Sequence, residues 1–323
     1  MAVETTDRVV TVIGGSGFIG RHIVGSLAKR GYRIRVACRR PDLAGHVQPL
    51  GAPGQIMPVQ ANVRYPASLA AACDGAYAVI NLTGVLCSAG AQSFDAVHVF
   101  GAEASAKAAK AARARLFIQM SAIGAAEADA SDYATSKAAG EKRARAAFPG
   151  AIILRPSIVF GPEDGFFNKF AAIARLAPAL PLIGGGATRF QPVFVGDVAA
   201  AIVMALEDKA KPGTTYELGG PEVKSFRELM ELLLAEIGRR RLLVPIPFAI
   251  ARLQAFFLEL LPNPLLTRDQ VILLERDNVV AAEAEREGRT LKALGISPTA
   301  LAAVLPSYLG RFRKAGQFTR AAS

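Results

Sequence analysis

The sequence predicts an α/β protein in which helices cover both faces of a parallel sheet and a smaller, mostly helical C-terminal lobe follows. Short apolar runs alternate with longer segments of helical periodicity through the first half of the 323 residues. Parallel strands need crossover connections, and right-handed crossovers place the helices on both faces of the sheet. A composition of 51% hydrophobic and 20% charged residues supplies enough apolar surface for such a core, and it argues against a disordered chain.

The strands and helices follow one another in regular order along this half of the chain. An apolar run at residues 9–13 ends in glycines, residues 18–30 have helical spacing, and residues 33–38 are again strand-like. These three segments form one strand–helix–strand unit. The same periodicities predict further strands over 56–59, 78–82, 116–120, 151–154 and 215–218, and further helices over 68–73, 94–113 and 133–148.

Proline and glycine clusters interrupt this alternation after Pro156. Residues 178–186 are rich in both, and helical spacing then predicts helices over 198–206, 226–238 and 248–261. We expect two domains from this change of pattern. They are a sheet domain over 1–160, to which 190–220 return, and a smaller lobe over 161–189 and 221–315, with a tail over 316–323.

Charge and the metal-ligating residue types narrow the range of partners. The chain carries 38 Lys and Arg against 27 Asp and Glu, a net charge of +11 that favours anionic partners. Because the basic residues are not clustered beside aromatic side chains, we expect no nucleic-acid binding. The cysteines and histidines lack the spacings of a disulfide framework or a metal site, so we expect neither. They are Cys38, Cys73, Cys87, His22, His46 and His98.

The apolar segments give no sign of export or of a membrane span. The first predicted strand begins at Val9, so we expect no targeting segment and a protein that stays where it is made. The most apolar later stretch, residues 242–266, contains Arg252, Glu259 and several prolines. It therefore lacks the roughly 18–20 uninterrupted apolar residues that a spanning helix needs.

A glycine-rich turn lies directly between the first predicted strand and the first predicted helix. It reads Gly14-Gly15-Ser16-Gly17-Phe18-Ile19-Gly20. At this place backbone N–H groups and the positive end of a helix face the pyrophosphate of a dinucleotide. Glycine allows the tight turn, the close approach of the phosphates and the packing of helix on strand. The turn predicts a Rossmann-type cofactor site formed by Gly14, Ser16, Gly17, Phe18, Ile19 and Gly20.

The end of the second predicted strand indicates which dinucleotide this site prefers. A site selective for NAD carries an acid there to bind the adenosine ribose, whereas this chain reads Cys38-Arg39-Arg40. A guanidinium binds a 2′-phosphate through two parallel hydrogen bonds and also stacks on adenine. We therefore expect NADPH, bound by Arg39 and Arg40. The alternative is that one or both arginines only contact solvent.

A tyrosine and a lysine lie four residues apart in the helix predicted over 133–148. On one face of a helix, the ammonium of Lys137 would stabilise the phenolate of Tyr133, whose pKa starts at about 10. The pair could then act as an acid or base, and Lys137 could equally bind the nicotinamide ribose. Ser121, just past a strand, would hydrogen-bond to the tyrosine or to substrate; a turn serine is the alternative.

Together these motifs resemble the short-chain dehydrogenase/reductase superfamily, in the extended or atypical branch that includes sugar-nucleotide epimerases and dehydratases. The resemblance covers residues 9–218. It implies that Asn62 and Val63 flank adenine and that Leu82, Thr83 and Gly84 pass under the cofactor. It also implies contacts to the nicotinamide end from Pro156 and Ile158, and cofactor contacts from Ser121, Tyr133 and Lys137.

Within that branch the chain resembles the nucleotide-binding accessory subunits of respiratory complex I, in their alphaproteobacterial form. The resemblance extends into the second lobe, and its stretches are residues 140–142, 148–153, 160–164, 166–168, 191–193, 245–248 and 266–271. It implies NADPH held for a structural or assembly role beside the core subunits where the membrane and peripheral arms meet. It also implies a peripheral location on the cytoplasmic side of the bacterial inner membrane, with residues 239–266 on the membrane surface or in the core of the lobe.

The resemblance to active epimerases fails in one short stretch. Those enzymes carry a run of hydroxyl residues after the fifth strand, whereas Ser121 is followed by Ala122 and Ile123. This favours an accessory subunit of the NADH:ubiquinone oxidoreductase without turnover of its own. Two alternatives are an active NADP-dependent reductase, epimerase or dehydratase that uses Tyr133 as its acid or base, and a free NADPH-sensing regulator.

Overall fold

The computed structural model describes residues 6–126, 129–261, 264–314 and 316, and its contacts divide the chain into two compact units. The first unit comprises residues 1–156, 195–218 and 282–297. The second unit comprises residues 157–194, 219–281 and 298–323. The predicted tail over 316–323 lies outside the described residues except for Gly316.

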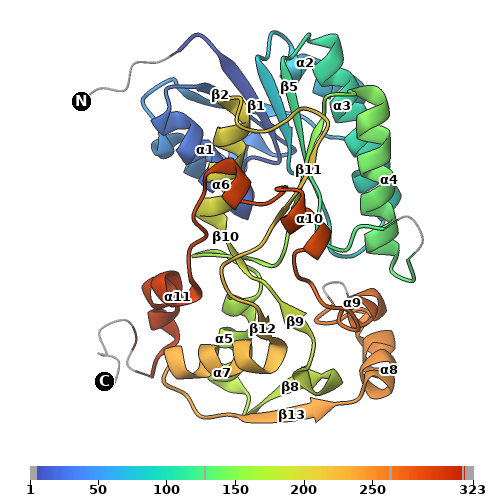
Figure 1. The fold of residues 1–323 in the computed structure, drawn as a ribbon, viewed down its shortest axis with the longest axis vertical. Helices are drawn as coiled ribbons and strands as arrows, with labels where there is room; N and C mark the ends of the chain where they lie inside the picture. The colour runs from blue at the N-terminus through green and yellow to red at the C-terminus, as the bar shows by residue number, and fades with distance from the viewer. Residues whose placement is uncertain (1–5, 127–128, 262–263, 315, 317–323) are drawn as a thin grey trace. The chain divides into compact units, whose positions relative to one another are not determined.

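The first unit contains a seven-stranded parallel sheet, which confirms the predicted fold class (Figure 1). The strand order is β11-β6-β5-β4-β1-β2-β3, and every neighbouring pair is parallel. The order reverses at β1, so the carboxyl ends of β1 and β4 open the crevice in which such sheets bind ligands. The strands are β1 (Val9–Ile13), β2 (Arg33–Cys38), β3 (Ile56–Gln60), β4 (Ala78–Asn81), β5 (Leu116–Met120), β6 (Ile152–Pro156) and β11 (Thr215–Leu218).

Helices pack on both faces of this sheet. Helices α1 (Phe18–Lys29) and α6 (Val195–Leu206) lie against each other on one face, while α2 (Pro66–Cys73), α3 (Gly101–Ala111) and α4 (Asp132–Ala147) pack side by side on the other (Figure 1). Alanines of α3 are fully buried in the core on that face, so this helix approaches the sheet closely. The short helix α10 (Ala282–Arg286) completes the unit.

Two segments of the first unit differ from the sequence prediction. The helix expected over 94–113 begins as a π-helix, η3 (Asp95–Phe100), before it continues as α3. Residues 282–297, expected in the second lobe, belong to the first unit. The backbone explains this placement, because Glu217 N–H donates to the carbonyl of Arg289 and thereby joins the segment to β11.

The second unit combines helices with three pairs of short strands. Its helices are α5 (Phe167–Leu176), α7 (Phe226–Glu236), α8 (Phe248–Leu258), α9 (Arg268–Leu273) and α11 (Leu301–Leu309). Its strand pairs are β7 (Val159–Phe160) with β10 (Val193–Phe194), β9 (Arg189–Phe190) with β12 (Lys224–Ser225), and β8 (Ala179–Ile183) with β13 (Leu242–Ile246). The predicted lobe lacked these pairs, because prolines at 181 and 245 lie within the longest one and mask its strand pattern.

A buried ion-pair network ties α4 to the edge of the sheet. Arg155 of β6 donates to both carboxylate oxygens of Glu141 on α4, at 2.8 and 2.7 Å. Its second terminal nitrogen lies 3.7 Å from Glu217 of β11. Both carboxylates are almost fully buried, and the guanidinium offsets part of the cost of burying their charges.

Removal of this guanidinium should destabilise the first unit severely. We expect Arg155→Ala to lower the free energy of unfolding by about 3–5 kcal/mol, because the buried Glu141 carboxylate loses both of its hydrogen bonds to the guanidinium and Glu217 loses a nearby positive charge. Denaturant unfolding followed by circular dichroism measures this change. The matched control is Lys107→Ala, which removes an exposed pair with Glu103 on α3 and should cost less than about 1 kcal/mol. Equal costs for the two variants would contradict a structural role for the network.

Candidate functional site

The glycine-rich turn connects β1 to α1 in a conformation that only glycine adopts easily. Gly14 has φ +80°, in the left-handed region, and its N–H donates to the carbonyl of Ala37 at the end of β2. Gly17 N–H donates to the carbonyl of Gly14 and closes the turn. Helix α1 then starts at Phe18 with no acidic residue in its first turn. Its free N–H groups can therefore bind an anion.

Gly20 allows α1 to pack directly on the turn that precedes it. A Cβ at this position would lie 2.6 Å from the carbonyl carbon, Cα and oxygen of Gly15, a distance that real Cβ atoms do not show. The backbone of the turn cannot yield without moving Gly14 and Gly17. The absence of a side chain at Gly20 thus sets the distance between helix and turn.

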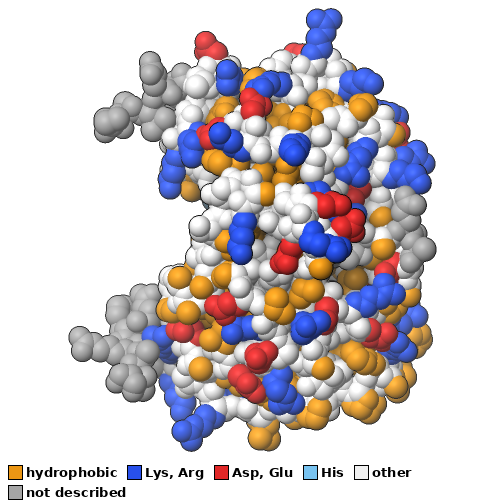
Figure 2. All heavy atoms as spheres, viewed as in Figure 1, with side chains coloured by type: hydrophobic (Ala, Val, Ile, Leu, Met, Phe, Trp, Pro, Cys, Tyr) orange, Lys and Arg blue, Asp and Glu red, His pale blue; other side chains and the backbone are white. Residues whose placement is uncertain are grey.

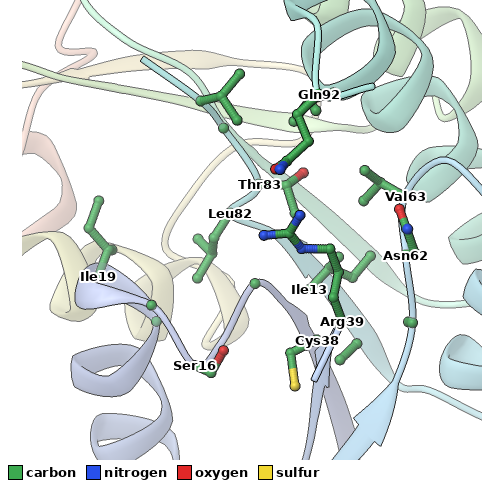
Figure 3. Close-up of a pocket in the computed structure, with 18 of the residues that line it drawn as sticks. Ile13, Ser16, Ile19, Cys38, Arg39, Asn62, Val63, Leu82, Thr83 and Gln92 are labelled. Atoms are coloured by element: carbon green, nitrogen blue, oxygen red, sulfur yellow. The ribbon is translucent and has the colours of Figure 1, made fainter. Parts of the chain in front are cut away.

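A cavity of about 560 Å³ lies above the turn (Figure 3). Its size falls within the range of about 300–1,000 Å³ that ligand sites occupy. The walls come from the turn, the end of β2, the residues after β3 and the loop after β4. The predicted residues that line it are Gly14, Ser16, Gly17, Phe18, Ile19, Gly20, Arg39, Asn62, Val63, Leu82, Thr83 and Gly84.

The two arginines after β2 have different positions. Arg39 lines the cavity, and Figure 3 shows its side chain projecting into it between Leu82 and Asn62. Arg40 is absent from the described lining, and its exposed guanidinium pairs with Asp42 at 2.6 Å. This pairing also lowers the pKa of the Asp42 carboxyl, which stays ionised beside the arginine. Of the two arginines expected at the cofactor, only Arg39 therefore faces the cavity.

Buried amides hold the wall of the cavity formed by the loop after β4. The side-chain oxygen of Asn81 accepts hydrogen bonds from the N–H and the hydroxyl of Thr83, at 3.1 and 2.6 Å. The amide nitrogen of Asn81 donates to Gln119 on the neighbouring strand, at 2.9 Å. Because both amides are buried and paired, Thr83 has a fixed orientation.

Tyr133 and Lys137 lie together on α4, as the spacing predicts, but neither lines the cavity itself. The Nζ atom of Lys137 is 5.7 Å from the centre of the Tyr133 ring. Burial lowers the pKa of Lys137 to about 8, although the nearby Glu141 opposes this effect. The lysine reaches the cavity through Gly84, since a Cβ on that lining residue would lie 3.1 Å from Nζ.

His98 lies in the same part of the site, and no motif in the sequence predicts this role. Its Nε2 atom accepts a hydrogen bond from the N–H of Val85, at 3.0 Å, and its Nδ1 atom lies 2.9 Å from the hydroxyl of Ser136. The imidazole ring also meets the Tyr133 ring edge-on, with 5.4 Å between ring centres, and stacks on the Phe94 ring, with 5.3 Å between ring centres. His98 therefore connects the loop after β4 to α4.

The remaining predicted residues do not line the cavity. The N–H of Ser121 donates to the carbonyl of Leu154, and its hydroxyl is buried without a hydrogen-bond partner among the described residues. Pro156 ends β6. Ile158 belongs to the second unit and packs against the core of that unit. Among the residues that the structure describes, no group of three or more His, Cys, Asp or Glu side chains could hold a metal ion.

The close packing at Gly20 generates a direct test of the site. We expect Gly20→Ala to weaken dinucleotide binding by about tenfold or more, equivalent to about 1.4 kcal/mol, because the methyl group pushes α1 away from the turn. Titration of NADPH fluorescence measures this affinity. Gly45→Ala is the matched control, since a Cβ there meets nothing within 4 Å. Unchanged affinity in Gly20→Ala would show that the turn does not bind the ligand.

The amino-acid sequence is similar to those of known protein families. The model of the NAD dependent epimerase/dehydratase family matches residues 10–219. The chain is 36% identical to the NADH dehydrogenase (ubiquinone) 1 alpha subcomplex subunit 9 of Arabidopsis thaliana mitochondria, over 95% of this chain and 79% of the plant protein. It is 37% identical to a ceramide reductase of Caulobacter vibrioides, over 60% of each chain.

Solved structures of sugar-nucleotide dehydratases and epimerases share the fold. A dTDP-glucose 4,6-dehydratase from Streptomyces venezuelae, solved with NAD and TYD bound, superposes with a TM-score of 0.71 at 21% identity and covers 94% of this chain and 96% of that one. The family match includes every strand of the parallel sheet except the first residue of β1. A nicotinamide dinucleotide is the cofactor that this match implies. The chain belongs to the NAD-dependent epimerase/dehydratase family.

Proposed function

We propose that the chain is an accessory subunit of respiratory complex I that binds NADPH for a structural or assembly role. The observation that carries this proposal is the extent of the likeness. Similarity to the plant complex I subunit covers 95% of the chain, whereas the family match ends at residue 219. The likeness therefore includes most of the second unit, where family members with other activities need not agree.

The chemistry of the cavity supports NADPH over NADH. Among the described residues that line it there is no aspartate or glutamate, and Arg39 and Arg64 are its two cations. A carboxylate would repel a 2′-phosphate, whereas a guanidinium binds it through charge-assisted hydrogen bonds. When bound, NADPH supplies a hydride donor. We propose that this chain keeps it as a fixed ligand on the glycine turn.

Arg39 should determine the preference for NADPH. We expect Arg39→Ala to weaken NADPH binding by about tenfold to a hundredfold, the effect of losing hydrogen bonds to a charged group, with little change for NADH. Arg40→Ala is the control, because Arg40 pairs with Asp42 outside the cavity and should alter neither affinity much. Equal losses for NADPH and NADH in Arg39→Ala would contradict the proposed 2′-phosphate contact.

An exposed apolar surface of the second unit supports attachment to a membrane complex. Helix α8 and the described residues after it expose seven large apolar side chains, and Figure 2 shows hydrophobic atoms gathered in this region. They are Ile250, Leu253, Phe256, Phe257, Leu260, Leu261 and Leu265. The one charged side chain of α8, Arg252, pairs with Glu275 and so does not oppose contact with an apolar partner. No helix in the described part of the chain is long and apolar enough to cross a membrane.

We therefore propose a peripheral position on the cytoplasmic side of a bacterial inner membrane, where residues 239–266 meet lipid or core subunits at the junction of the two arms. Residues 262 and 263 of this segment lie outside the described residues. The three arginines at 239–241 would attract anionic headgroups. A wide apolar face beside basic residues is typical of segments that lie in a membrane interface.

Isolation of the protein from its native membrane tests this function. We expect a tagged chain extracted with mild detergent to copurify with complex I core subunits. The double variant Leu253→Glu/Phe257→Glu should lose them, because two charges replace apolar contacts, whereas Leu43→Glu, an exposed leucine of the first unit, should retain them. A lone protein without respiratory subunits would contradict the proposal.

An active reductase is a second candidate, and Tyr133 with Lys137 favours it. The two side chains lie together on α4, and a relative that is 37% identical over 60% of this chain bears the name ceramide reductase. Against it, Ala122 and Ile123 stand where active epimerases carry hydroxyl residues. Substrate-dependent oxidation of NADPH that Tyr133→Phe abolishes would support this candidate instead.

A further inference from the structure

His98 occupies a place that the function described so far does not use. It lies in the π-helix η3, between the loop after β4 and helix α4, and its side chain is 2% exposed. A π-helical turn inserts a residue and reorients the side chains that follow, and such turns are frequent at functional sites. The backbone of this turn meets α4 directly, since a Cβ on Gly140 would lie 2.1 Å from the carbonyl oxygen of His98.

The hydrogen bonds of His98 define which nitrogen carries its proton. Nε2 accepts from the N–H of Val85, so it carries no hydrogen. The proton therefore lies on Nδ1 and is donated to the hydroxyl of Ser136, which in turn donates to the carbonyl of Tyr133. Burial, with the nearby Lys137 ammonium, lowers the pKa of His98 to about 3, so the ring stays neutral.

The hydrogen bonds of His98 and Ser136 link the loop at Gly84 to the turn of α4 that carries Tyr133 and Lys137. Val85 follows Gly84, whose hydrogen would face the Lys137 ammonium, while Ser136 and Tyr133 belong to the same turn of α4 as that lysine. A change at His98 would let the loop move relative to α4. The other wall of the cavity, around the glycine turn and Arg39, has no contact in this network.

We propose that His98 is a positioning residue that locks the Gly84–Val85 loop to the Tyr133/Lys137 face of α4 and so shapes the nicotinamide-ribose end of the cofactor site. This inference rests on the proposed binding of NADPH with its adenosine end at Arg39. His98 does not touch the adenosine end. Loss of His98 should therefore weaken binding of the whole dinucleotide, but it should not change binding of a fragment that lacks the nicotinamide half.

Two amide substitutions separate the two hydrogen bonds of the ring. The amide of asparagine occupies about the place of Nδ1 and that of glutamine about the place of Nε2. His98→Gln retains the contact to Val85, whereas His98→Asn retains only the contact to Ser136. We expect NADPH to bind about tenfold more weakly to His98→Asn, and His98→Gln to restore most of the affinity.

The fragment adenosine 2′,5′-bisphosphate provides the internal control, measured by calorimetry on the full chain. It should bind wild type and all variants within about twofold, because the cavity wall at Arg39 is unchanged. Ser136→Ala is a milder change. It should weaken NADPH binding less than His98→Asn does, and it should leave the affinity for the fragment unchanged.

Two results would overturn the inference. One is wild-type affinity for NADPH in both His98 variants. The other is an equal loss of NADPH and fragment in the His98 variants and in Ser136→Ala, which would indicate a general structural role. If wild type itself binds neither ligand, the proposed cofactor site fails, and this outcome is distinct because it requires no variant.

Discussion

The direct contact between α1 and the turn that precedes it is the constraint on which the site depends. Gly20 brings the helix to the backbone of Gly15, and Gly14 turns the chain under the end of β2. The free N–H groups of the helix then face the cavity, with Arg39 at its other wall. A side chain at Gly20 would separate the anion-binding groups from the rest of the site.

Buried polar pairs fix the other walls. Asn81 with Gln119 orients Thr83, and His98 connects the loop after β4 to α4. The Arg155 network holds α4 to the sheet edge. Apolar packing alone would allow these loops several arrangements, whereas a buried hydrogen bond is costly to leave unmade and therefore selects one.

Local sequence patterns predicted the sheet and the turn well, because strand periodicity and the glycine motif depend only on residues that are close in sequence. They could not separate Arg39 from Arg40, since the difference comes from the pairing of Arg40 with Asp42. The role of His98 depends on Val85 and Ser136, which are distant in sequence. The pairing of β8 with β13 was missed for the same reason, because both strands contain proline and meet only in the folded chain.

The identity of the nucleotide that the protein carries from its native membrane tests the central claim most directly. The protein, purified without added cofactor, would be denatured and the released nucleotide quantified by mass spectrometry against the protein. The account predicts close to one NADPH or NADP per chain, retained through purification. Release of NAD or NADH instead, or of no nucleotide at all, would contradict a structural NADPH on the glycine turn.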